Sequence, residues 1–203
     1  MINPMELIHA LKEWAVTVDA LEQGETILLL RKGGIREQGG SFTVAQSQVL
    51  LYPTYEHQQP QLLKSAYTTQ VKPVPSGWHP STVRIGSWAR ITHVFQVSEA
   101  PVVNDLLPYH VWNAQFTEDR LRWKPRQPLS VLLLRTYKLS QAQVVSYRPE
   151  YGGCKSWIDL SEAIALADSA PVIHDAAYAQ QVSDIQAIIE THQCAAEAPV
   201  RVR

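Results

Sequence analysis

The run PLSVLLLRTYKL, residues 128–139, constrains the fold of this chain more than any other segment does. Its centre is a block of consecutive aliphatic residues at 131–134, which is typical of a strand buried inside a sheet. The block is far shorter than the roughly 20 apolar residues that cross a bilayer. We therefore expect a buried strand here and no membrane partner.

Further strands are expected where β-branched or alternating apolar residues lie between turn residues. Near the N-terminus helical spacing competes with a strand pattern, and we favour a short helix to about Lys12 followed by a strand. Gln23-Gly24 would then form a hairpin turn. The expected strands lie at 14–21, 26–32, 41–46, 47–53 (ended by Pro53), 82–98 (bent at Gly86) and 143–149, the last as the antiparallel neighbour of 128–139.

Short helices are expected at 59–67, 101–112 and 117–124, the last with Thr117 as its N-cap. In the C-terminal third, Asp159 and Glu162 form a capping-box pattern. This pattern predicts a helix at 162–168, and an apolar stripe predicts another at 175–192.

Strands followed by helices predict an α+β fold, with a mostly antiparallel, barrel-like sheet, short helices and a helical C-terminal segment. We expect two parts in the chain. Residues 1–155 would form the α+β core domain, and residues 156–203 a helical extension packed on it.

Charge is distributed unevenly along the chain. Residues 156–200 contain seven acidic residues and no Lys or Arg, whereas the first 155 residues contain 16 basic and 12 acidic residues, a difference of +4. A mildly basic body suits an anionic partner, although such a split also occurs in soluble proteins without that function. The chain opens with no secretory leader and its two cysteines lack metal spacing, so we expect a cytoplasmic protein.

The segment RKGGIREQGG, residues 31–40, joins basic residues to four glycines. It matches neither the P-loop pattern nor the dinucleotide-binding pattern. Its backbone N–H groups, together with Arg31, Lys32 and Arg36, can bind an anion. The alternative is a turn whose glycines provide positive φ.

The stretch RLRWKPR places Arg120, Arg122, Lys124 and Arg126 around Trp123. This pattern is typical of an edge that contacts phosphates and offers a stacking surface to a base. A solvated surface segment is the alternative. The predicted binding residues outside these two stretches are Tyr55, Arg135 and Lys155.

Two places are candidates for catalysis. Glu56 and His57 combine a carboxylate with a histidine, but neighbouring residues do not face each other on a strand or helix, so each needs a partner from elsewhere. Cys154 follows two glycines ahead of a predicted helix, where the pKa of a thiol can fall. Turn and helix-capping roles are the simpler alternatives. No spacing predicts a metal site, and no motif predicts a cofactor.

Four motifs together, LLLRKGGIRE, LLYPTYEHQ, PLSVLLLRTYKL and YGGCKSW, resemble an uncharacterised bacterial family common in cyanobacteria, domain of unknown function 1802. The resemblance extends from about Ala10 to Leu160 and leaves the C-terminal helix outside. It implies no established activity or catalytic residues. An association of the family with Mrr-type restriction endonuclease domains implies a role in restriction-modification, with this chain as the companion of a nuclease.

These observations leave three functional hypotheses. The leading one is a nucleic-acid-binding or restriction-associated accessory module, which binds DNA or another anionic ligand and has a nuclease or other protein partner. The second is a small hydrolase that uses His57 and Glu56 with Lys32 or Cys154. The third is a protein-interaction subunit whose acidic C-terminal helix docks on a partner.

Overall fold

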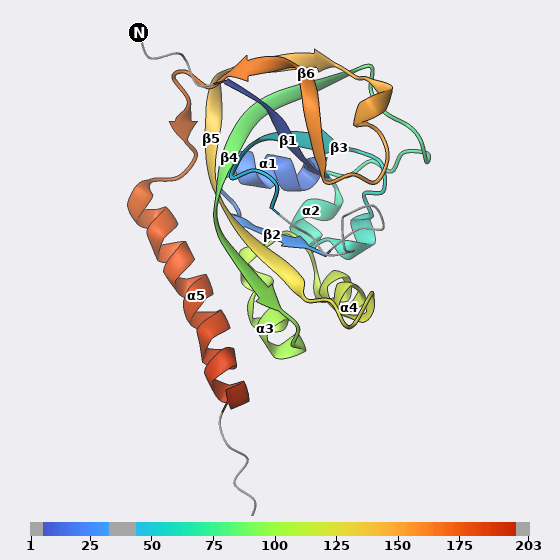
Figure 1. Ribbon diagram of the computed structural model, residues 1–203. Helices are drawn as coiled ribbons and strands as arrows, with labels where there is room; N and C mark the ends of the chain where they lie inside the picture. Colours follow the sequence, from blue (N-terminus) through green and yellow to red (C-terminus); the bar gives the residue numbers. More distant parts are fainter. Residues whose placement is uncertain (1–5, 33–43, 198–203) are drawn as a thin grey trace, which may run out of the picture.

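A computed structural model describes residues 6–32 and 44–197, with side chains as far as residue 192 (Figure 1). The strands are β1 (Glu6–Trp14), β2 (Leu28–Arg31), β3 (Gln48–Thr54), β4 (Thr82–Val97), β5 (Leu129–Ser146), β6 (Trp157–Ala165) and β7 (Ala170–Pro171). The α-helices are α1 (Ala15–Gln23), α2 (Ser65–Thr68), α3 (Ala100–Asp105), α4 (Ala114–Arg122) and α5 (Asp175–Glu197). Three single 3-10 turns lie at Pro60–Leu62, Leu107–Tyr109 and Pro149–Tyr151.

The strands form one open sheet in the order β2-β5-β4-β3-β1-β6, with β7 paired to β5. Only β1 and β3 are parallel, and the other pairs in the described chain are antiparallel. The predicted mixture of helices with a mostly antiparallel sheet is therefore confirmed. The predicted barrel is wrong, because among the described strands the two edges, β2 and β6, do not pair with each other.

Strands β4 and β5 form the long centre of the sheet, paired from Thr82 with Ser146 to Val97 with Leu129. The aliphatic block at 131–134 is buried, as predicted. The register shifts across Gly86, so the predicted bend in β4 is confirmed. Strand β5 runs on to Ser146, so the expected separate strand at 143–149 is wrong.

The N-terminal segment is the reverse of the prediction, since strand β1 comes first and helix α1 follows. Strand β1 is paired with both β3 and β6, and these two ladders outweigh the helical spacing of its apolar residues. Helix α1 buries Val16, Val18 and Leu21 in the core, so packing overrides their strand propensity. Gly24 is no hairpin turn: it ends α1 with φ of +75°, where glycine is the favoured residue.

The parallel strands β1 and β3 place their carboxyl ends at the same edge of the sheet. Lys12 lies opposite Tyr52, and Trp14 lies opposite Thr54. We expected strand β3 to end at Pro53, but it continues through Pro53 to Thr54. Of the strand expected at 41–46, residues 44–46 carry no strand and 41–43 lie outside the described residues. The segments that follow β1 and β3 therefore meet at one place, which is the candidate site below.

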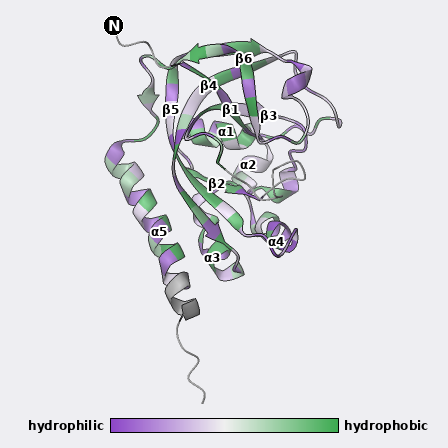
Figure 2. Ribbon diagram, viewed as in Figure 1, coloured by the Kyte–Doolittle hydropathy of each residue, from purple (hydrophilic) through white to green (hydrophobic). Residues whose placement is uncertain are grey.

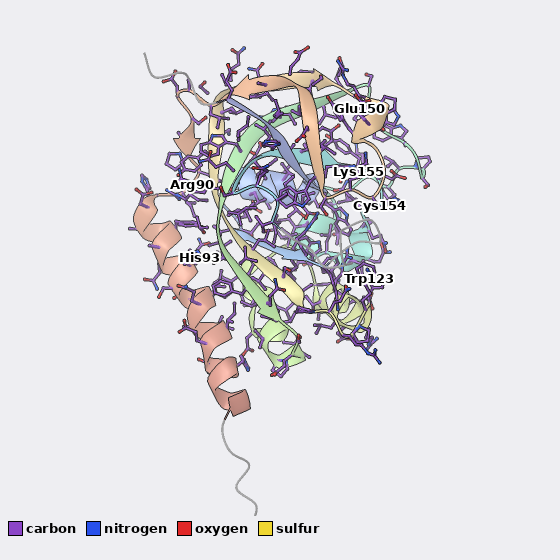
Figure 3. All side chains as sticks on the ribbon, in the orientation of Figure 1. Arg90, His93, Trp123, Glu150, Cys154 and Lys155 are labelled. Atoms are coloured by element: carbon purple, nitrogen blue, oxygen red, sulfur yellow. The ribbon has the colours of Figure 1, made fainter. Side chains whose placement is uncertain are left out.

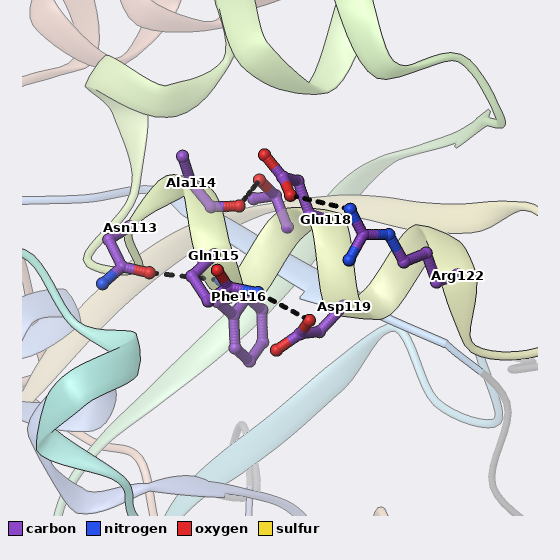
Figure 4. Close-up of polar contacts among 8 residues, drawn as sticks. Asn113, Ala114, Gln115, Phe116, Glu118, Asp119 and Arg122 are labelled. Atoms are coloured by element: carbon purple, nitrogen blue, oxygen red, sulfur yellow. Dashed lines mark hydrogen bonds and ion pairs between the residues drawn. The ribbon is translucent and has the colours of Figure 1, made fainter.

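The helices between the strands are shorter than predicted. The expected helix at 59–67 is a 3-10 turn followed by α2, and the helix expected at 101–112 ends with α3 at Asp105. Helix α4 begins earlier than predicted, because the side chain of Asn113 accepts a hydrogen bond from Phe116 N at 3.1 Å (Figure 4). Thr117 is inside the helix and is not its N-cap.

The C-terminal third contains a strand where we predicted a helix. Asp159 and Glu162 lie in β6, which pairs with β1, so the capping-box interpretation is wrong. The long helix α5 is confirmed. A boundary at residue 155 stays a prediction, but β6 belongs to the sheet, and the helical part of the segment starts only at α5.

The apolar side chains form two clusters. The larger one joins α1, α3 and α4 to β2 and β5, and includes Val182, Ile185 and Ile189 of α5. The smaller one lies under β6 and includes Tyr52, Trp88 and Tyr151. Figure 2 shows apolar colouring along the inner strands and mixed colouring on α5. Among the described residues, no helix is both long and apolar enough to cross a membrane.

Replacing Ile185 tests whether α5 is an integral part of this core. Ile185 is fully buried, so Ile185→Ala should lower the free energy of unfolding by roughly 3 kcal/mol, measured by urea denaturation. Ser183 is exposed on the same helix, and Ser183→Ala should change it by less than about 0.5 kcal/mol. An unchanged main transition in Ile185→Ala would show that α5 is a detachable extension.

Candidate functional site

The site is built around Lys12, at the carboxyl end of β1. Its ammonium donates hydrogen bonds to the backbone carbonyls of Tyr151 at 2.6 Å and Gly153 at 2.9 Å. Its backbone N–H donates to the carbonyl of Ser156 at 2.8 Å. These contacts hold the motif YGGCKSW against β1, although 139 residues or more separate the two segments.

Ionisable groups from three of the four motifs act on the ammonium of Lys12. Burial lowers the pKa of Lys12; Cys154 and Glu56 act to raise that pKa, and Lys155 and Arg31 act to lower it. Figure 3 shows Cys154, Lys155 and Trp123 on the side of the molecule away from α5. Sequence reasoning missed Lys12, because it stands alone in a segment that was predicted to be helical.

Next to Lys12, the buried carboxylate of Glu13 organises two arginines. One oxygen accepts from Arg31 Nη1 at 2.8 Å, and the other accepts from the backbone N–H of Trp14 at 2.8 Å. The Glu13 side chain is 5% exposed and that of Arg31 is 16% exposed. Burial lowers the pKa of Arg120. The carboxylate of Glu13 acts to raise this pKa, and the guanidinium of Arg31 acts to lower it. One buried anion therefore acts on two cations.

The predicted residue Lys32 links this cluster to the end of α4. It is buried, and its ammonium donates to the carbonyls of Arg120 at 2.7 Å and Leu121 at 3.2 Å. A cation at a helix carboxyl terminus is favourable, so Lys32 fixes α4 against β2. This contact directs the ammonium into the protein, which does not favour the predicted role of Lys32 in binding or hydrolysis.

The predicted aromatic residue Trp123 follows α4 and is 38% exposed. The guanidinium of Arg120 lies 5.9 Å from its ring centroid, and the ammonium of Lys124 lies 4.7 Å from it. Cations at these distances are attracted to the ring face. The structure thus brings Arg120 and Lys124 to the ring of Trp123, and Arg31 is near enough to act on the pKa of Arg120.

The segment after β3 forms the opposite border of the site. Glu56 accepts hydrogen bonds from the backbone N–H of Gly77 at 2.6 Å and from Ser76 Oγ at 3.2 Å. Its Oε1 also lies 3.3 Å from His57 Nε2. The expectation that these neighbours do not pair is therefore wrong, and the reason is the positive φ of His57, +66°, which turns its side chain back.

The other predicted residues are dispersed. Arg122 pairs with Glu118 on the exposed side of α4, and Arg126 is exposed (Figure 4 shows the Arg122 pair). Arg31 of β2 is paired with Ser130 of β5. Arg135 is five residues further along β5, so it lies about 17 Å from Ser130 and on the opposite face of the strand. It binds the carbonyl of Ile173 and the carboxylate of Asp175, at the start of α5. Arg36 lies outside the described residues.

A shallow hollow of about 430 Å³ adjoins the site at Lys155. Nδ1 of His9 and Oδ1 of Asp159 are hydrogen-bonded at 2.6 Å in its wall, across β1 and β6. The polar side chains that line it also include Gln46 and Glu150. In the part of the chain that the structure describes, no three His, Cys, Asp or Glu side chains gather as a metal site requires.

Comparison with known proteins gives one family. A family model described as domain of unknown function (DUF1802) matches residues 10–184. The match therefore extends into α5, further than the limit at Leu160 that the four motifs had implied. No curated protein matches this chain.

Among solved structures, the crystal structure of ASCH from Zymomonas mobilis is similar to this chain. The TM-score is 0.45, with 13% sequence identity over 76% of this chain and 87% of that chain. Two mutants of the same protein align with TM-scores of 0.43, at 12% and 13% identity.

Removing the charge of Glu13 should destabilise the fold. Glu13→Gln removes the buried carboxylate that binds Arg31 and acts on Arg120, so we expect the free energy of unfolding to fall by roughly 3 kcal/mol in urea denaturation. Glu118→Gln removes an exposed carboxylate that pairs with Arg122, and should cost less than about 0.5 kcal/mol. Equal losses in the two variants would contradict the role given to Glu13.

The attachment of the 70–80 loop should depend on pH through Glu56. The N–H of Gly77, followed by His57 and Ser76, holds the pKa of Glu56 below its usual value, although burial opposes this. The carboxylate form therefore holds the loop fully above about pH 4.3, and the contact is lost as the pH falls through the lowered pKa. The amide resonance of Gly77 should titrate below pH 4.3, and Glu56→Gln should abolish this step. A midpoint at or above 4.3 would contradict the assignment.

Proposed function

The chain belongs to the family domain of unknown function 1802. We propose that it is a nucleic-acid-binding module whose binding face is the cluster around Lys12 and Glu13. The proposal depends on one observation, which is that basic residues from separate segments of the chain lie together there. Arg31 comes from β2, Arg120 from α4 and Lys155 from the turn before β6. Such an excess of positive charge attracts a polyanion.

The arrangement of charges in the site favours a ligand with several phosphates over a small carboxylic acid. Arg31, Arg120 and Lys155 form an extended basic group around Lys12, whose own ammonium is bound to two backbone carbonyls. An extended group matches the regular spacing of phosphates along a strand. Trp123 at one end adds an exposed ring on which a base can stack.

The contacts support binding more than hydrolysis. The hydrolase hypothesis requires His57 and Glu56 to meet Lys32 or Cys154 around a substrate, but Lys32 is directed to the carbonyls at the end of α4. Glu56 is engaged by the 70–80 loop. A nuclease partner and a role in restriction-modification remain part of the proposal, in which this chain supplies binding and its partner the chemistry.

Binding to nucleic acid should weaken steeply with salt. In gel-shift measurements across a salt series, the logarithm of the binding constant should fall linearly with the logarithm of salt concentration, with a slope of about −0.7 to −0.9 for each phosphate contacted. The absence of binding at low salt, for every duplex and single-stranded substrate tested, would refute the proposal.

A charge reversal at Lys155 should locate the binding face. Lys155→Glu should weaken binding about tenfold and reduce the magnitude of the salt slope, because an exposed cation next to Lys12 is replaced by an anion. The matched control is Lys138→Glu, an exposed lysine on β5 that lies opposite Ala170 of β7. The control should change affinity less than about twofold; equal effects would show that the charge acts through the whole protein and not at this face.

A further inference from the structure

A second exposed tryptophan, which was not among the predicted binding residues, lies at the far border of the site beside Tyr55. Trp78, in the proline-rich 70–80 loop, is 43% exposed. One edge of its ring system packs against Tyr55, with centroids 6.0 Å apart and planes at 89°. Tyr and Trp rings are enriched at interfaces, where one part of the ring is apolar and another is in water.

The position of Trp78 is fixed by the neighbouring residues. Glu56 binds Gly77 and Ser76, the two residues before it, and the prolines of the loop restrict its backbone. A ring held in this way loses little conformational entropy when a ligand packs on it. The loop therefore presents the indole in a fixed orientation.

A continuous series of contacts joins Trp78 to Trp123. Trp78 packs on Tyr55, and the preceding Thr54 donates to the carbonyl of Glu13 at 3.0 Å. Glu13 binds Arg31, and the next residue, Lys32, binds the carbonyl of Arg120 at 2.7 Å. Arg120 in turn lies 5.9 Å from the ring of Trp123.

The figures place the 70–80 loop and Trp123 on the same side of the molecule. The 70–80 loop lies on the right of Figure 1, and Lys155 and Trp123 are labelled on the same side in Figure 3. Arg31, Lys32 and Arg120 lie between the two rings in this series. The surface thus has an aromatic ring at each end and cations between them.

We propose that this surface binds a single-stranded segment of nucleic acid, with one base stacked on Trp123, another on Trp78, and the intervening phosphates beside the basic residues. The inference rests on the proposed function and deepens it. A duplex hides the faces of its bases and would leave both indoles in water. A single strand offers unstacked bases, and every base has a face that stacks on an aromatic ring.

Fluorescence anisotropy with labelled oligonucleotides tests this inference. The probes are a DNA strand of about 12 nucleotides, the RNA strand of the same sequence, and the matching DNA duplex. We expect single strands to bind about tenfold more tightly than the duplex at equal salt, because only they gain the two stacking contacts. The tighter of the two single strands identifies the natural ligand, and either preference supports the inference.

Substitutions at the two rings separate stacking from charge. Trp78→Leu and Trp123→Leu should each weaken single-strand binding about tenfold, and the double variant about a hundredfold, while duplex binding and the salt slope stay unchanged. Trp78→Phe should restore most of the affinity, because a phenyl ring still stacks. The control is Val94→Ala on β4, since Val94 is also 43% exposed; it should change affinity less than about twofold.

The outcomes distinguish this inference from the proposed function. Equal affinity for duplex and single strands, together with wild-type binding by Trp78→Leu, would overturn the inference and leave nucleic-acid binding standing. A loss of affinity in Trp78→Leu that Trp78→Phe does not restore would also overturn it, since the loss would then come from the altered loop. No binding of any probe by the wild-type protein would overturn both.

Discussion

The buried carboxylate of Glu13 is the interaction on which the site depends. It lies at the carboxyl end of β1, binds Arg31 of β2 and raises the pKa of Arg120 of α4 against the effect of burial. Burying a charged group without an opposite charge costs several kcal/mol, and the carboxylate of Glu13 offsets part of this cost for the two guanidinium groups.

The parallel pair of β1 and β3 explains why this anion and the aromatic border occur together. Parallel strands end at the same edge of a sheet, so the start of α1 and the segment after β3 are neighbours. The side chain of Gln58, from that segment, accepts from the N–H of Val16 at 3.1 Å and satisfies one open donor at the start of α1. The strands thus position Tyr55 and Glu56 beside the cluster of Glu13, and these two residues hold the tryptophan loop.

The fold could be predicted from the sequence where local pattern and burial agree. The prediction failed where pairing with distant segments decided the structure. The aliphatic block of β5, the bend at Gly86 and helix α5 were predicted correctly. The pattern of Asp159 and Glu162 resembled a helix start, but Ile158 and Leu160 alternate with polar residues and indicate the strand that β1 pairs with. Within the site, Arg31, Arg120 and Lys155 were identified by their charge. Lys12 and Glu13 were missed because their role comes from contacts with residues far along the chain.

The separation of charge along the chain has a structural counterpart. The acidic helix α5 lies along one side of the molecule, next to α3 and β4, and the candidate site lies on the other (Figure 1). The first acidic residue of α5, Asp175, is already paired with Arg135. Exposed charges further apart than about 8 Å are largely screened at physiological ionic strength. The acidic residues of α5 therefore cannot cancel the field of the basic face, and the net charge of −1 for the chain does not describe the charge that a ligand meets at the site.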